Sequence, residues 1–505
     1  MKEKDDLITQ RKEKIEQLYC DGINPYPNKY DYTHTADEVF DKFSDIKEEQ
    51  ESQETVKVAG RIIANRKMGK ACFSHLKTDS SVAAISEIKR AKSDKIQIYM
   101  RKDIVGDEQY QLYKKLDIGD FIGVEGKIFR TKTGELTVKV NSFILLSKSL
   151  RPLPEKWHGL KDVETRYRQR YVDLIVNQDV KEVFIKRSRI VKTMREFLDD
   201  EGFLEVETPM MQSIAGGATA RPFVTHHKAL GMDLFLRIAP ELYLKRLIIG
   251  GISKVYEINR NFRNEGLSKR HNPEFTMLEL YQAYLDYEGV MNLCEEMMTH
   301  VVQKVLGTLQ VQYQGQYIDF SCPWQKLTLT EAIKKYTDVD FSKVKDADEA
   351  KKIAKSLNVS VEDDYKLGKI INRIVEECVE PKLLLPTFII DYPVDISPLA
   401  KSKPDDPDTV ERFELYIGGQ EVANAYSELN DPQEQRKRML AQAEERQSGD
   451  DEAQMLDEDY LRAMEYGMPP CGGLGIGIDR LVMLLTDSAT IRDVIFFPQM
   501  RKEVK

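Results

Sequence analysis

Residues 255–281 combine arginines, a histidine, glutamates and aromatic residues in one short stretch. The planar guanidinium of Arg263 can hold phosphate oxygens with two donors, and Phe275 offers a flat face for a purine. Burying an unpaired charge costs roughly several kcal/mol, so a structural hairpin rarely carries so many charges beside aromatic rings. A solvated hairpin with surface ion pairs is the alternative. The regular spacing of Phe262, Phe275 and Tyr281 favours a nucleotide-binding site.

Two glutamates, Glu414 and Glu421, flank the glycine pair Gly418–Gly419. If the chain turns at the glycines, two strands bring both carboxylates together, which is costly unless a cation joins them. Hard oxygen ligands beside phosphates favour Mg²⁺. Two ordinary strand glutamates would give the same pattern, so the spacing alone leaves both interpretations open.

Three segments resemble the motifs of a known enzyme family. The segments Asn261-Phe-Arg-Asn-Glu-Gly and Arg270-His-Asn-Pro-Glu-Phe-Thr-Met-Leu-Glu resemble motif 2 of the class II aminoacyl-tRNA synthetases, in the form found in lysyl-tRNA synthetases. Residues 183–209 resemble motif 1, a helix and a strand that ends at a proline, and residues 472–485 resemble motif 3. The resemblance covers the chain from about residue 54 to residue 500 and preserves the order of the motifs.

The resemblance implies an ATP-dependent active site. It makes Arg263, on the α-phosphate, and Arg480, on the γ-phosphate, the catalytic residues. It makes Glu414 and Glu421 ligands of a Mg²⁺ ion bound with ATP. The implied ATP contacts are Arg263, Glu265, His271, Asn272, Phe275, Glu414, Gly477 and Arg480. No zinc site is expected, because none of the six cysteines forms a C-x-x-C pair.

The resemblance also implies a pocket for L-lysine. An ε-ammonium group needs carboxylate partners and an aromatic wall, which Glu279, Glu428, Tyr281 and Tyr426 can provide. The full implied set is Gly217, Glu241, Glu279, Tyr281, Asn424, Tyr426 and Glu428. The expected reaction activates lysine to lysyl-adenylate and transfers it to the 3′ end of tRNA(Lys).

Three alternatives are open at this stage. An aspartyl- or asparaginyl-tRNA synthetase of the same subclass would need Arg or Lys at the side-chain end of the pocket, and the acidic residues disfavour it. A non-catalytic tRNA-binding paralogue would have lost motif arginines or carboxylates, and none is lost here. A lysine ligase that modifies a protein would lack the amino-terminal barrel predicted below.

Five short alternating segments between residues 54 and 148 predict a small Greek-key barrel of the OB type, although other small barrels fit nearly as well. Such barrels bind single-stranded nucleic acid with aromatic platforms and polar base-edge contacts. Phe73, Gln97 and Glu135 fall where the family has its anticodon-reading residues. The segment Ser80–Lys95 is longer than the tight turn expected there. A tolerated surface insertion is the preferred interpretation, and an added tRNA contact is the alternative.

The expected architecture is multidomain α+β. It comprises a helical extension (1–53), an OB-fold anticodon-binding domain (54–148), a hinge (149–178) and a class II catalytic domain (179–505) built on an antiparallel β-sheet flanked by helices. In the family, motif 1 forms a dimer interface, so we expect a homodimer.

Composition sets further limits. The chain has 505 residues and a net charge of −9, so contact with tRNA must come from local basic patches. The first residues resemble neither a secretory signal nor a transit peptide. No apolar run approaches the ~18 residues needed to span a bilayer. We therefore expect a cytoplasmic protein with no membrane partner.

Overall fold

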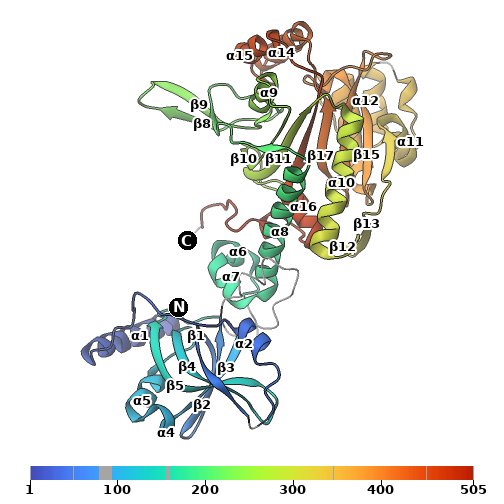
Figure 1. The fold of residues 1–505 in the computed structure, drawn as a ribbon. Helices are drawn as coiled ribbons and strands as arrows, with labels where there is room; N and C mark the ends of the chain where they lie inside the picture. The colour runs from blue at the N-terminus through green and yellow to red at the C-terminus, as the bar shows by residue number, and fades with distance from the viewer. Residues whose placement is uncertain are drawn as a thin grey trace. The chain divides into compact units, whose positions relative to one another are not determined.

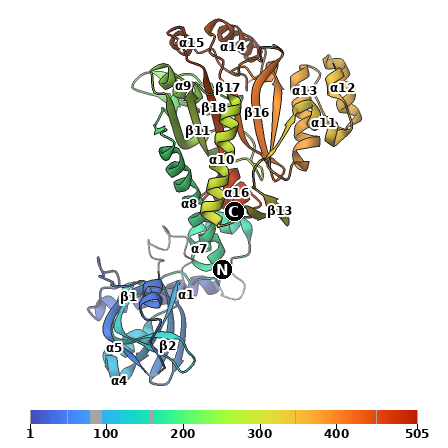
Figure 2. The same ribbon diagram turned by 45° about the vertical axis from the view of Figure 1, so that its right-hand side comes forward.

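The computed structural model describes residues 2–48, 50–78, 94–154, 160–344, 346–450 and 452–503. The chain forms two compact units, Met1–Gln178 and Asp179–Lys505 (Figures 1 and 2). Most of the predicted insertion Ser80–Lys95 lies outside the described residues. No helix within the described ranges is long and apolar enough to cross a membrane.

The first unit contains a closed barrel. Its strands are β1 (Glu51–Met68), β2 (Ala71–Lys77), β3 (Lys95–Arg101), β4 (Phe121–Arg130) and β5 (Leu136–Ser147). They pair in the order β1-β2-β3-β5-β4, and β3 runs parallel to β5. The short helices α4 (Lys102–Val105) and α5 (Asp107–Lys115) connect β3 to β4. Alternating apolar residues such as Val56 and Val58 fill the interior, so the predicted five-stranded Greek-key barrel is confirmed.

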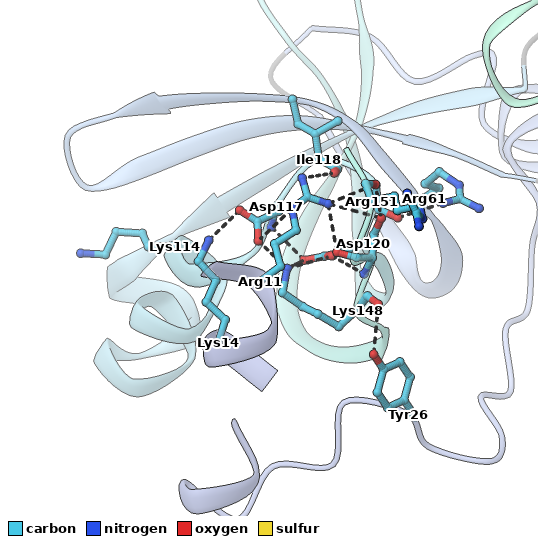
Figure 3. Close-up of polar contacts among 12 residues, drawn as sticks. Arg11, Lys14, Tyr26, Arg61, Lys114, Asp117, Ile118, Asp120, Lys148 and Arg151 are labelled. Atoms are coloured by element: carbon cyan, nitrogen blue, oxygen red, sulfur yellow. Dashed lines mark hydrogen bonds and ion pairs between the residues drawn. The ribbon is translucent and has the colours of Figure 1, made fainter. Parts of the chain in front are cut away.

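Further helices of this unit are α1 (Lys2–Cys20), α2 (Ala36–Lys42), α6 (Val163–Arg168) and α7 (Arg170–Val176). Polar contacts hold α1 against the barrel (Figure 3). Arg11 donates to the Ser149 carbonyl at 2.9 Å, and Lys14 pairs with Asp117 at 2.7 Å. The buried Lys148 reaches Asp117 at 2.5 Å and Asp120 at 2.7 Å. The helix is therefore fixed to the barrel by charged groups.

The second unit is organised on an eight-stranded sheet in the order β14-β15-β16-β17-β18-β11-β10-β6. The strands are β6 (Leu204–Glu205), β10 (Lys254–Phe262), β11 (Glu274–Ala283), β14 (Gln325–Thr328), β15 (Thr387–Pro393), β16 (Thr409–Ile417), β17 (Gln420–Ser427) and β18 (Cys471–Gly477). All neighbours are antiparallel except β14 with β15 and β10 with β6. This confirms the predicted antiparallel-rich sheet, although the strand expected after Phe203 pairs over only two residues.

Helices surround this sheet, and α10 lies across one face (Figures 1 and 2). The helices are α8 (Gln178–Asp200), α9 (Glu241–Ile249), α10 (Tyr287–Leu306), α11 (Leu329–Thr337), α12 (Ala347–Ser356), α13 (Leu367–Ile374), α14 (Pro432–Gln447), α15 (Glu458–Glu465), α16 (Ile478–Leu485) and α17 (Ile491–Val494). Short helical turns are η1 (Phe341–Lys343), η2 (Val375–Val379), η3 (Glu380–Lys382) and η4 (Val394–Ile396). Small strands outside the main sheet are β7 (Met211–Gln212), β8 (Val224–His227), β9 (Met232–Leu236), β12 (Gln310–Tyr313) and β13 (Gln316–Asp319).

One helix differs from its sequence-based expectation. A helix is predicted over 362–377, but α13 begins at Leu367 and continues into the π-helical turn η2. Ile370 and Ile374 are fully buried, whereas Glu362, Asp363 and Asp364 are exposed. Because helices in proteins are stabilised mainly by packing of their apolar face, the acidic residues stay outside the helix.

Candidate active site

A cavity of about 370 Å³ opens among β11, β16, β17, β18, the segment after β10 and the starts of α9 and α16. Every residue predicted for the ATP and lysine sites lines it, although these residues are spread from Gly217 to Arg480 in the sequence. The antiparallel pairing explains this convergence. Because β11 pairs with β18 and β18 pairs with β17, side chains of one face of three strands point into the same space.

One end of the cavity carries arginines and an aromatic face. The guanidinium of Arg263 lies 5.1 Å from the centre of the Phe275 ring. Arg480, near the start of α16, donates to the Glu421 carbonyl at 2.7 Å, and its other amino group lies 3.4 Å from His271 Nε2. Burial, together with Arg480, lowers the pKa of His271, so its neutral ring can accept this hydrogen bond at neutral pH. This end can bind a purine and its phosphates.

The Glu414 carboxylate is held by groups that sequence reasoning missed. Arg412 donates to its Oε1 at 2.6 Å, while Tyr392 and Tyr416 donate to its Oε2 at 2.9 and 2.5 Å. Burial raises the pKa of Glu414, and the Arg412 charge opposes that rise. Strand alternation is the signal that could have found two of these residues, since positions 412, 414 and 416 share one face of β16.

The second predicted metal ligand, Glu421, faces the same cavity. It lies opposite Tyr416 in the β16–β17 pairing, and Arg480 contacts its Oε2 at 3.1 Å. No cluster of three or more His, Cys, Asp or Glu side chains suited to a metal occurs in the part of the chain that the structure describes.

The other end of the cavity is acidic. It contains Glu241, Glu279 and Glu428, and all three side chains are almost fully buried. Tyr426 donates to Glu241 Oε1 at 2.7 Å, and Tyr281 lies 3.3 Å from Glu279 Oε2. Burial, with Glu241 nearby, raises the pKa of Glu279 to about 8. Such an acidic end with aromatic walls can bind an ammonium group.

Two glycines give this end its shape. Gly217 has a φ of +86°, and a Cβ there would lie 2.9 Å from the Glu241 Cβ. A Cβ on Gly473 would lie 2.1 Å from Glu428 Oε1 and 2.5 Å from the Tyr281 ring. Any larger residue would therefore displace the groups that form the pocket.

The barrel brings the three predicted anticodon residues into one region of β2, β3 and β5. Phe73 stacks on Tyr99 with ring centres 4.5 Å apart. Gln97 donates to Glu135 Oε2 at 2.7 Å, and His75 Nε2 lies 2.8 Å from Glu135 Oε1. Sequence reasoning missed Tyr99 and His75. The alternation of β2 and β3 could have revealed both, because each lies two residues from a predicted one.

Comparison with known proteins defines the class. Residues 162–501 match the family model of tRNA synthetases class II (D, K and N), and residues 56–146 match the OB-fold nucleic acid binding domain. The chain therefore belongs to the class II tRNA synthetases of the D, K and N group and carries an OB-fold domain. This confirms the family expected from the motifs.

Within that class, three similar relatives have the same name. The lysine–tRNA ligase of Carboxydothermus hydrogenoformans is 60% identical over 499 residues, which are 99% of each chain. Those of Pelotomaculum thermopropionicum and Bacillus subtilis are 57% and 53% identical. The matched segments cover 98% and 99% of this chain, and 95% and 98% of the relatives.

Proposed function

We propose that this chain is a lysine–tRNA ligase, which activates L-lysine with ATP and transfers it to the 3′ end of tRNA(Lys) for translation in the cytoplasm. One observation carries the proposal: a single cavity has arginines at one end and three carboxylates at the other. L-lysine bound along it would place its ammonium groups at the acidic end. Its carboxylate would then face the phosphates held at the arginine end.

The reaction follows from positioning. A carboxylate oxygen of lysine attacks the α-phosphorus of ATP, and the bond to the bridging oxygen breaks, so lysyl-adenylate forms and pyrophosphate leaves. Arg263 and Arg480 stabilise the charge that develops on the phosphates, and Phe275 holds the adenine. The terminal ribose hydroxyl of tRNA then attacks the lysyl carbonyl, and AMP leaves. No protein nucleophile is required.

Glu414 and Glu421 fit a Mg²⁺ ion bound with ATP. Both present carboxylate oxygens to one cavity, which is the donor chemistry that Mg²⁺ prefers together with phosphate oxygens. Their arginine contacts fix both side chains in position. When bound, the ion supplies charge neutralisation at the phosphates.

The acidic end favours lysine over aspartate or asparagine. An aspartate side chain would meet Glu241, Glu279 and Glu428, and like charges in a buried site repel strongly. Rejection of ornithine, which is one methylene shorter, rests on only about 1–3 kcal/mol. We therefore expect measurable but weaker activity with ornithine.

The proposal includes tRNA and a second copy of the chain as partners. Phe73, Gln97 and Glu135 would read the anticodon with stacking and base-edge hydrogen bonds. A homodimer through the motif 1 region rests on the resemblance to motif 1, and several apolar side chains in this segment and in the residues that follow it are exposed. These are Leu204, Met211, Val224, Leu230 and Met232.

Amino-acid-dependent ATP–pyrophosphate exchange tests the proposal without tRNA. With Mg²⁺ present, lysine should support exchange, ornithine should support it weakly, and the other standard amino acids should not. Exchange with aspartate or asparagine instead would agree with a class II synthetase but refute lysine as the substrate. No exchange with any amino acid, from folded protein, would favour a non-catalytic tRNA-binding protein.

A further inference from the structure

A buried lysine stands behind the acidic end of the cavity. Lys245, on α9, is fully buried, and its ammonium lies 2.5 Å from Glu241 Oε1. It also forms an ion pair with Glu428 Oε2. Its ammonium lies 5.9 and 5.4 Å from the ring centres of Tyr281 and Tyr426. Lys245 thus touches four pocket residues, yet it does not itself line the cavity.

The two carboxylate oxygens of Glu428 have different surroundings. Both oxygens are buried and neither accepts a hydrogen bond of ordinary geometry from a described residue, but Oε2 forms the ion pair with Lys245, whereas Oε1 forms none. Gly473 leaves room beside Oε1, since a Cβ there would lie only 2.1 Å away. An unpartnered buried carboxylate oxygen is costly, so Oε1 is suited to receive a cation from a ligand.

The charge count at this end supports the same role. Glu241, Glu279 and Glu428 would carry three negative charges when ionised, and Lys245 supplies one positive charge. Burial raises the pKa of the Glu428 carboxyl, whereas the Lys245 charge opposes that rise. Lys245 therefore offsets part of the negative charge at this end from outside the cavity.

We propose that Lys245 is a positioning residue for amino-acid selection. From behind the pocket wall its ammonium group holds the carboxylates of Glu241 and Glu428 in place and so directs the free oxygen of Glu428 at the ε-ammonium of the substrate. This inference rests on the proposed lysine activation. A purely structural pair is the alternative, but buried ion pairs are weak contributors to stability compared with apolar residues of similar volume.

The experiment replaces Lys245 and measures pyrophosphate exchange. Lys245→Met retains the side-chain volume and removes the charge. It should raise the KM for lysine by about tenfold or more, because Glu428 loses the partner that holds its carboxylate, while the KM for ATP changes by less than about twofold. Lys245→Arg retains the charge with a larger head group and should raise the lysine KM by less than Lys245→Met does.

Lys148→Met is the matched control. Lys148 is also buried and paired with two carboxylates, Asp117 and Asp120, but it belongs to the barrel unit. Its loss should affect thermal stability and leave the lysine KM unchanged. This control separates the general effect of deleting a buried paired lysine from an effect on the pocket.

Inhibition by L-norleucine gives a second readout. Norleucine has the carbon chain of lysine without the ε-ammonium. Lys245→Met should therefore weaken the binding of lysine far more than the binding of norleucine. Equal weakening of both would indicate a collapsed pocket and overturn the proposal, as would an unchanged lysine KM. If Lys245→Met does not fold, Lys245→Arg is tested in the same way, by comparing its loss of lysine affinity with its loss of norleucine affinity. A wrong proposed function would be recognised separately, because the unmodified protein would then show no lysine-dependent exchange.

Discussion

At the scale of single residues, the protonation of Glu279 connects burial to substrate affinity. Burial raises its pKa to about 8, and the nearby Glu241 adds to the shift. Below this pH the empty site holds Glu279 in its neutral form, which attracts an ammonium group less. The KM for lysine should therefore fall as pH rises from about 6.5 to about 8.5, by roughly tenfold for each unit of pH at most. Steady-state exchange kinetics across this range would measure it.

Glu279→Gln is the control for this pH dependence, since it is neutral throughout and should flatten the profile. A pH dependence that survives in Glu279→Gln would assign the titration to another group.

The same carboxyl group makes the empty protein less stable as pH rises, although lysine binding becomes stronger. The folded empty protein retains the proton up to about pH 8, while the unfolded chain releases it near 4.5. This contribution to the free energy of unfolding is therefore lost as pH rises between these values.

Gly473→Ala tests the space beside Glu428. The new methyl group would lie within 2.1 Å of Glu428 Oε1 and 2.5 Å of the Tyr281 ring, so one of them must move. The lysine KM should rise by about tenfold or more, as expected for a misplaced charged partner. The ATP KM should stay nearly constant. An unchanged lysine KM in pyrophosphate exchange would show that Glu428 Oε1 does not contact the substrate.

At the scale of elements, one ion pair connects all three motifs. Arg187 on α8 donates to Asp479 Oδ1 on α16 at 2.5 Å and to Thr276 Oγ1 on β11 at 3.0 Å. The other Asp479 oxygen accepts from the Thr276 backbone N–H at 2.7 Å. Asp479 precedes Arg480 and lies almost fully buried. The motif 1 helix therefore supports the strand and helix that position Arg480, the arginine proposed to bind the γ-phosphate.

Arg187→Met should disturb this junction. Removing one partner of a mostly buried pair leaves Asp479 uncompensated, which should lower the free energy of unfolding by about 2–4 kcal/mol. It should also lower kcat of exchange, because Arg480 loses its support. Lys192→Met is the control, since Lys192 lies on the same helix in an exposed pair with Glu196 and should change stability by less than about 0.5 kcal/mol. Equal effects of both variants, by denaturant unfolding, would contradict the role of the junction.

The sequence predicts site residues whose interactions are local, but not those that act through residues far away in the sequence. The β10–β11 hairpin follows from alternation, because side chains two residues apart share a face. The match to family motifs supplied Gly217 and Glu241, which local pattern could not connect to the pocket. Lys245 and Arg187 were missed, since each acts through a partner on another element. Glu241 and Lys245 are four residues apart on one helix, but Glu428 is brought in only by the sheet.

At the scale of the whole molecule, the residues proposed for lysine activation and those proposed for anticodon recognition lie in different compact units. Every residue lining the activation cavity lies in Asp179–Lys505, whereas Phe73, Gln97 and Glu135 lie in Met1–Gln178. Lysine activation should therefore be independent of the barrel surface, and only the transfer to tRNA should require it.

Phe73→Ala separates the two steps. Stacking of one base on an aromatic ring contributes about 1–3 kcal/mol, so kcat/KM for tRNA in aminoacylation should fall by about 5- to 150-fold. Lysine-dependent pyrophosphate exchange should be unchanged, because Phe73 belongs to the barrel unit. Ile144→Ala, at an exposed apolar position of β5, is the control and should leave both assays unaffected. Parallel loss of exchange and aminoacylation in Phe73→Ala would mean that the barrel is needed for folding of the whole chain. Unchanged aminoacylation would remove Phe73 from anticodon recognition.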